Sequence, residues 1–167
     1  MPTNLLARVD WSFIYPPFYE RVFQVVGMLH DGGNDFWATS GYRSPEEQLA
    51  LWQHGRNEAG AVVDPKSVVT KLKSGPHNLG IACDLVRDAD LNLPGLQPDY
   101  KAADYEPLAT TAEAHGLESG LRWKGFVDAD HVQLPLSKYG LQMGALRRIH
   151  QIHGLKAVFL ELDKYKW

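Results

Sequence analysis

The sequence contains a single cysteine, Cys83, so no disulfide bond can form within the chain. It lacks any apolar run that approaches the length of a membrane span. Residues 1–10 lack the basic start and long apolar stretch of a secretory signal. The net charge is only −3, so there is no global signal for binding a polyanion, and we expect no nucleic-acid partner.

Internal repeats and low-complexity linkers are also absent, so we expect one domain over residues 1–167. Within it, 44% of the residues are hydrophobic and 22% are charged, which is ordinary for a soluble globular protein. A chain of 167 residues is long enough to bury a real hydrophobic core.

Local patterns predict a mixture of helices and strands. Apolar residues at helical spacing after Pro16 predict a helix that ends at Gly32. Ser44 precedes Pro45 and Glu47, which predicts an N-cap, a proline in the first turn and a capping box. Further elements are expected as strands over residues 36–39 and 81–86, a helix capped by Asp104 that runs to His115, and one or two helices over residues 141–162.

The segment from Ser74 to Asp84 combines residue types that bind metals. His77 and Asp84 lie seven residues apart, and imidazole and carboxylate are both good zinc ligands. Gly80 allows a sharp entry into the strand that follows. Strand alternation places Asp84 on one face and Cys83 on the other, towards the core, so we interpret Cys83 as a buried structural thiol. By themselves, these two residues are as consistent with a buried strand and a preceding turn as with a metal site.

One of the seven histidines, His131, lies in a distinctive segment, Trp123-Lys-Gly-Phe-Val-Asp-Ala-Asp-His131. Together, the pattern His-x-x-Gly-x-Ala-x-Asp at residues 77–84, the pattern Trp-x-x-Phe-x-Asp-x-x-His at residues 123–131 and the run Ser-Gly-Tyr-Arg-Ser at residues 40–44 resemble the zinc peptidases that cut peptidoglycan stem peptides. That family includes D-alanyl-D-alanine dipeptidases and carboxypeptidases, and L-alanyl-D-glutamate endopeptidases, among them many phage endolysins. The chain departs from the family at Gly75, where a serine is usual, so a hydroxyl role is not carried over.

The resemblance implies one zinc ion held by His77, Asp84 and His131, with a fourth position left open for water, whose pKa zinc lowers to near 7. It also implies that Asp128, three residues before His131, is the general acid and base, with Asp130 in a supporting or surface role. On a regular strand neither aspartate shares a face with His131, so a turn near Ala129 is required.

The resemblance further implies that Arg43 holds either the developing oxyanion or a substrate carboxylate. Tyr42 and Trp123 are expected either to wall the cleft or to pack in the core. Lys66, Lys71 and Lys73 make residues 56–73 basic, and this segment is either the border of a cleft for an anionic peptide or a solvated loop. His150 and His153, three apart on an expected helix, lack a nearby carboxylate or thiol partner.

The fold implied is α+β, with a small antiparallel sheet that carries the zinc site and helices packed on one side, the Hedgehog-like fold of this family. Within the resemblance, Asp128, with Phe126 and Gln133, favours cleavage of the L-alanyl-D-glutamate bond, because the endopeptidase branch commonly has aspartate at this position and the dipeptidase branch glutamate. We expect a monomeric endolysin. Without a secretory signal, such an enzyme is made in the host cytoplasm and reaches the wall by lysis or through a pore. A D-alanyl-D-alanine carboxypeptidase or dipeptidase and a non-catalytic zinc-containing wall-binding module remain alternatives.

Overall fold

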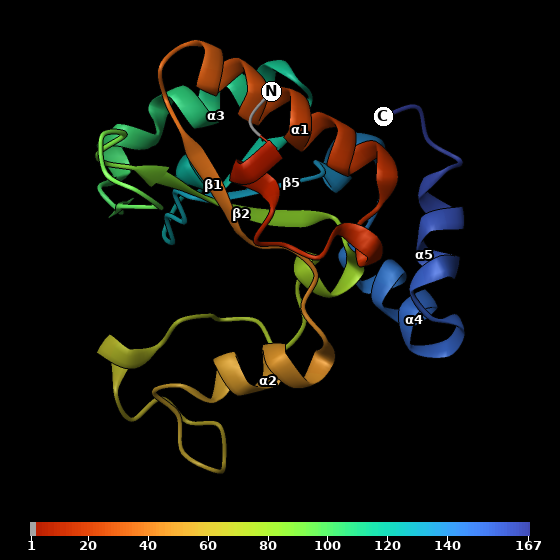
Figure 1. The fold of residues 1–167 in the computed structure, drawn as a ribbon. Coiled ribbons are helices and arrows are strands. Elements are labelled where there is room, and N and C mark those ends of the chain that lie inside the picture. Colours follow the sequence, from red (N-terminus) through yellow and green to blue (C-terminus); the bar gives the residue numbers. More distant parts are fainter. Residues whose placement is uncertain (1–2) are drawn as a thin grey trace.

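A computed structural model describes residues 3–167 and has an α+β architecture (Figure 1). Five α-helices and a small antiparallel sheet make up the described chain, and no helix in this part is long and apolar enough to cross a membrane. The helices are α1 (Pro16–Asp31), α2 (Pro45–Gln53), α3 (Glu106–Ala114), α4 (Met143–His153) and α5 (Leu155–Leu162). The strands are β1 (Phe36–Ser40), β2 (Ala82–Asp88), β3 (Pro98–Asp99), β4 (Glu118–Ser119) and β5 (His131–Gln133).

The sheet has the strand order β1-β2-β5-β4, and β3 pairs with the far end of β2. Helices α1 and α3 lie together over the sheet, whereas α4 packs against α5 and against the 3-10 turn Pro76–Leu79 (Figure 1). The apolar face of α1 is buried, as its spacing predicts, and comprises Phe18, Val22, Val25, Val26 and Leu29.

The expected strand alternation in β2 is confirmed at its start. Cys83 is completely buried within the hydrophobic core, whereas Asp84 is half-buried on the opposite face. Burial raises the pKa of the Cys83 thiol well above its usual value, so this cysteine is an inert core residue. Gly80 adopts a left-handed conformation with φ 66° at the end of the turn that leads into β2.

The capping box before α2 is confirmed: Ser44 Oγ accepts from the Glu47 backbone N–H, and the Glu47 carboxylate accepts from the Ser44 N–H. The predicted cap at Asp104 is wrong. Residues Ala102–Tyr105 form a 3-10 turn and α3 begins only at Glu106, with a proline in its first turn, so Asp104 lies inside the preceding turn.

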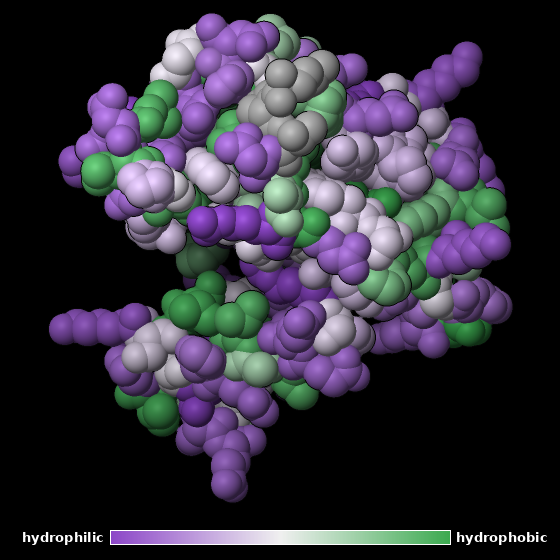
Figure 2. All heavy atoms as spheres, in the orientation of Figure 1, coloured by the Kyte–Doolittle hydropathy of each residue, from purple (hydrophilic) through white to green (hydrophobic). Residues whose placement is uncertain are grey.

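One part of the molecule stands apart from the sheet. Helix α2 and the irregular segment after it, which contains only one short 3-10 turn, lie below the sheet in Figure 1. We call residues 44–75 the α2 lobe. The space-filling view shows a hollow between this lobe and the body of the molecule (Figure 2).

Candidate metal centre

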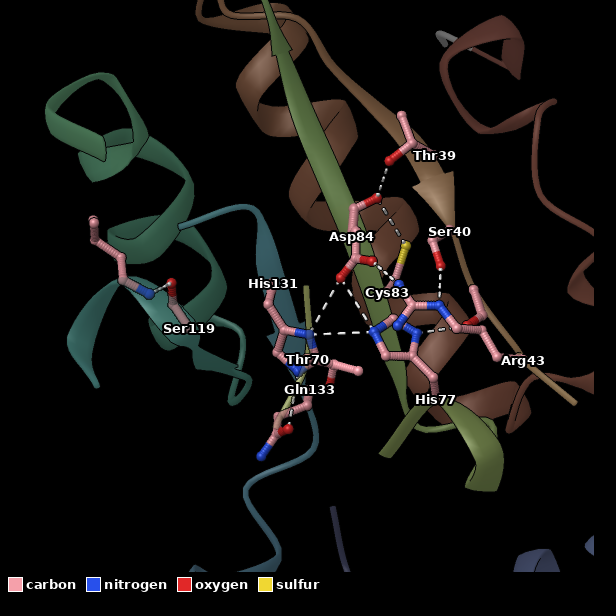
Figure 3. Close-up of polar contacts among 12 residues, drawn as sticks. Thr39, Ser40, Arg43, Thr70, His77, Cys83, Asp84, Ser119, His131 and Gln133 are labelled. Atoms are coloured by element: carbon pink, nitrogen blue, oxygen red, sulfur yellow. Dashed lines mark hydrogen bonds and ion pairs between the residues drawn. The ribbon is translucent and has the colours of Figure 1, made fainter. Parts of the chain in front are cut away.

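Three elements bring His77, Asp84 and His131 together. Asp84 in β2 is paired directly with His131 in β5, so the register of the two strands sets these side chains opposite each other. His77 comes from the 3-10 turn Pro76–Leu79, and Gly80 directs the chain from that turn into β2. Figure 3 shows the three side chains pointing toward a common point.

The facing atoms form a nearly equilateral triangle. Asp84 Oδ1 lies 3.2 Å from His77 Nε2 and 3.2 Å from His131 Nδ1, and the two nitrogens are 3.3 Å apart. A tetrahedral zinc ion with ligand bonds of about 2.0–2.1 Å requires neighbouring ligand atoms about 3.3 Å apart. The spacing therefore fits a small divalent cation bound by two imidazoles and one carboxylate.

The hydrogen bonds on the outer side of each imidazole fix which nitrogen can bind a metal. His77 Nδ1 lies 2.6 Å from the Gly41 carbonyl oxygen, which can only accept, so Nδ1 carries the proton. His131 Nε2 lies 2.9 Å from Gln133 Oε1, while the Gln133 amide nitrogen donates to Glu118. The inner nitrogens are therefore lone-pair atoms that face the Asp84 carboxylate, and a cation satisfies all three.

The charges in this cluster shift two pKa values. Burial raises the pKa of Asp84, but the neighbouring His77 and His131 outweigh it and hold this pKa well below its usual range. Burial lowers the pKa of His131, but the hydrogen bond that its protonated form donates to Asp84, together with the charge of that carboxylate, outweighs burial and raises it. Asp84 is therefore ionised at neutral pH, as a metal ligand must be.

Arg43 contacts this cluster directly. Its guanidinium forms an ion pair with Asp84 Oδ2, and its Nε donates to Ser40 Oγ at 3.0 Å (Figure 3). Asn78 Nδ2 donates to the Arg43 carbonyl at 2.8 Å, so both the backbone and the head group of Arg43 are held. The role of Asn78 was missed from the sequence, although it lies next to His77 in the motif.

Asp128 and Asp130 both line the same pocket as the three ligand-type residues. The His131 N–H donates to the Asp128 carbonyl at 3.2 Å, which closes the turn that the strand geometry requires around Ala129. Burial raises the pKa of Asp130 to about 7, and the charges of Asp84 and Asp128 act in the same direction. Asp130 is therefore a pocket residue beside Asp128 rather than a surface residue.

The pocket has a volume of about 340 Å³. Trp123 forms part of its wall, with its ring centroid 5.0 Å from that of His131, and its indole N–H donates to Glu118. Tyr42 instead lines a larger neighbouring cavity of about 690 Å³, which includes none of the three ligand-type residues, and it packs against Phe13. Of the two expected wall residues, only Trp123 borders the metal pocket.

Gln48 was not assigned a role from the sequence. It is the buried residue of α2, and its Nε2 donates to the Leu72 carbonyl at 2.7 Å, while its Oε1 has no hydrogen-bond partner. Gly75, at the position of the expected serine, also lines the pocket, and its N–H donates to Asn78 Oδ1. The carbonyl of Ser74 accepts from Arg147, so the backbone here is held from α4.

The other histidine candidates lie outside this cluster. Among residues 3–167, the only group of three or more ligand-type residues close enough to share an ion is His77, Asp84 and His131. His115 Nδ1 contacts the Thr111 carbonyl at the end of α3. His150 and His153 lie in the last turn of α4.

The fold and the cluster define a class: a small α+β protein whose sheet and the turn before β2 present two histidines and one carboxylate, beside further carboxylates, in a pocket suited to a divalent metal. Residues 70–134, which contain all three ligand-type residues, match a family model described as D-alanyl-D-alanine carboxypeptidase. Over this segment the chain is similar to that family of peptidases.

A curated protein is similar over a longer part of the chain. The chain is 27% identical over 132 residues to the peptidoglycan L-alanyl-D-glutamate endopeptidase CwlK of Bacillus subtilis, covering 74% of each chain. The fold is shared with the L-Ala D-Glu endopeptidase ChiX of Serratia marcescens, at a TM-score of 0.55 and 22% identity over 78% of this chain and 86% of that one. The LD-carboxypeptidase LdcB also shares it, at a TM-score of 0.52 and 18% identity, covering 83% and 79%.

Proposed function

We propose that the protein is a zinc-dependent peptidase that hydrolyses the L-alanyl-D-glutamate bond of peptidoglycan stem peptides. The observation that carries the proposal is the triangle of lone-pair atoms from His77, Asp84 and His131, with Asp128 in the same pocket. The proposed substrate is supported by the similarity to CwlK and ChiX, both of which are named as L-alanyl-D-glutamate endopeptidases.

Zinc bound by these three residues would polarise a scissile carbonyl and lower the pKa of water near it. The chain's own residues supply the proton transfers and the orientation. Asp128 accepts a proton from the attacking water on its carboxylate and passes it to the nitrogen of the leaving amine. Asp130 lies beside Asp128 in the same pocket, and burial raises the pKa of Asp130 to about 7.

Arg43 has two tasks in this proposal. Its ion pair with Asp84 Oδ2 leaves Oδ1 to face the histidine nitrogens, so the guanidinium orients a metal ligand. It also lines the pocket, where it supplies a fixed positive charge for an oxyanion or a substrate carboxylate. The capped start of α2 and the Asn78 side chain hold it in place before substrate binds.

In biological terms we propose that the enzyme acts as an endolysin, made in the host cytoplasm and delivered to the wall by lysis. A second candidate activity is release of terminal D-alanine, because the matched family model is described as D-alanyl-D-alanine carboxypeptidase.

The deciding experiment incubates zinc-loaded protein with purified peptidoglycan and identifies the new chain ends by mass spectrometry. New N-terminal D-glutamate is the expected product. Released D-alanine would replace the proposal with the carboxypeptidase activity, and no product at all would indicate a binding module. The matched control is His131→Ala, together with chelator-treated protein before and after zinc is restored.

A further inference from the structure

Lys71 borders the metal pocket, and no carboxylate neutralises its charge in the part of the chain that the structure describes. It lines the pocket from the α2 lobe, and Phe126 lines it from the segment before β5. The Lys71 Nζ lies 4.8 Å from the centroid of the Phe126 ring, so the two side chains meet across the opening. Within residues 3–167, no carboxylate lies within ion-pair distance of this ammonium group.

Hydrogen bonds from Gln48 and within the segment hold the two neighbours of Lys71 in the chain. Gln48 Nε2 donates to the Leu72 carbonyl at 2.7 Å and to Thr70 Oγ1 at 3.4 Å, and Thr70 Oγ1 also accepts from the Leu72 N–H. Gln48 is itself buried in the lobe. The exposed lysine side chain is therefore presented from a held segment rather than from a free loop end.

The charges that line the pocket indicate what the Lys71 ammonium group can bind. The lining carries three carboxylates, Asp84, Asp128 and Asp130, and only two permanent cations, Arg43 and Lys71. Arg43 is paired with Asp84. Lys71 is therefore the lining cation whose charge no carboxylate of residues 3–167 neutralises, and it is free to pair with an anionic ligand that approaches Asp128.

The proposed substrate places such an anion on one particular side. A glutamyl residue has two carboxyl groups, and only one of them can continue the peptide, so the other remains free. The same residue supplies the leaving amine, to which Asp128 gives a proton. Lys71 contacts Phe126, two residues before Asp128, and lines the same pocket as Asp128, so it supplies a cation in the pocket that would receive this residue.

We infer that Lys71 forms a carboxylate subsite that binds the free carboxylate of the glutamyl residue on the leaving side of the scissile bond. This inference rests on the proposed function. The ammonium exchanges its contact with the Phe126 ring for a charged hydrogen bond to the substrate, which is the stronger interaction. The subsite makes the enzyme prefer a free carboxylate over its amide at this position.

The test uses two soluble stem peptides that are identical except that the free glutamyl carboxylate is a primary amide in the second. Wild-type enzyme should cleave the acid peptide with the higher kcat/KM. Lys71→Met should lower kcat/KM for the acid peptide by about 10- to 100-fold, the scale of one lost charged hydrogen bond, mainly through KM. It should leave the amide peptide unchanged, and Lys71→Arg should restore much of the preference.

Lys73→Met is the matched control. Lys73 lies on the same segment, but its ammonium sits 4.2 Å from the Trp52 ring and does not line the pocket. It should leave both peptides unaffected. A loss for Lys71→Met that is equal on both peptides, or a wild type without preference, would overturn the subsite while leaving the proposed function intact.

Binding gives a readout that does not depend on turnover. Calorimetric titration of zinc-loaded Asp128→Asn with each peptide should show tighter binding of the acid, and adding Lys71→Met should remove the difference. Equal affinities would refute the subsite. Failure to bind or cleave either peptide would instead refute the proposed substrate, and the subsite with it.

Discussion

At the residue scale, Gln133 shows how a single side chain can decide the chemistry of its neighbour. From the sequence it was only a marker of substrate preference. In the structure its Oε1 faces His131 Nε2 at 2.9 Å, and its amide nitrogen reaches Glu118, which also accepts from the indole of Trp123. Such outer partners fix the tautomer of a metal-binding histidine and raise its basicity.

Gln133→Met should therefore weaken zinc binding by about 10- to 100-fold, the usual effect of losing an outer partner, with little change in fold. Competition with a fluorescent zinc chelator measures the affinity, and circular dichroism checks the fold. Gln151→Met, on the exposed side of α4, is the matched control and should bind zinc normally. Unchanged affinity in Gln133→Met would mean that His131 is oriented by strand pairing alone.

His77→Ala and His131→Ala should each lose zinc, because either change leaves only two protein ligands. Metal analysis after dialysis measures the zinc content of each variant, and His150→Ala serves as a control that should retain the ion. One zinc per chain in both variants would exclude the proposed centre.

Asp128→Asn should keep zinc and the fold but lose at least ~10²-fold in rate, the scale for removing a general acid and base. Asp130→Asn should have a milder effect, although its carboxyl lies in the same pocket. Hydrolysis rates of a soluble stem peptide, measured with zinc content for both variants, decide between them. If Asp130→Asn is inactive and Asp128→Asn is active, the two roles are exchanged.

At the element scale, the sequence was sufficient wherever structure depends on neighbours along the chain. Helix α1 follows from apolar spacing, and the start of α2 follows from Ser44, Pro45 and Glu47. The sequence was insufficient where contacts between distant segments determine the structure. Residue Asp104 lies within a 3-10 turn instead of capping a helix. The burial of Gln48 is explained only by its hydrogen bond to the carbonyl of Leu72, which a local sequence pattern cannot reveal.

The same reasoning explains the candidate site. The motifs named the ligand types, but their mutual placement depends on β2 pairing with β5 and on the turn before β2. The ion pair between Arg43 and Asp84 was not anticipated, because its partners lie 41 residues apart on different elements. Residues that support the site through hydrogen bonds, such as Asn78, can be identified only from the contacts in the folded structure.

Gly80→Ala should destabilise the protein and disturb the metal site. A left-handed conformation costs a residue with a Cβ about 1–2 kcal/mol, and the added Cβ would overlap the Phe13 carbonyl oxygen. Thermal unfolding and zinc affinity should both fall. Gly27→Ala is the matched control, because this glycine lies within α1 with nothing within 4 Å of an added Cβ, and alanine there should stabilise by about 0.5–1 kcal/mol. Equal melting temperatures for the two variants would contradict this account of Gly80.

At the scale of the whole molecule, stability is unevenly distributed. The hydrophobic core draws on the N-terminal segment, α1, the sheet and the C-terminal helices, and among the described residues it includes none between 43 and 78. Helix α2 buries only Gln48, and Leu49 on the same helix is 42% exposed. The α2 lobe nevertheless supplies one wall of the metal pocket, including Lys71. The better-packed body therefore carries the three ligand-type residues, and under the proposed function the less stable lobe would contact substrate.

This division predicts a gradient in amide hydrogen exchange. Segments with few buried apolar contacts open at low free-energy cost, so amides in residues 45–73 should exchange orders of magnitude faster than those of α1 and β2. Mass spectrometry of proteolytic fragments after deuterium labelling measures this directly.

Zinc alone should slow exchange mainly around residues 77–84 and 131, whereas zinc with the acid stem peptide, added to inactive Asp128→Asn, should also protect residues 69–73. The Lys71→Met change made in the same background should reduce that second protection and leave the first intact. Exchange in α2 as slow as in α1 before any ligand is added would show that the lobe belongs to the stable core and does not move independently of the metal site.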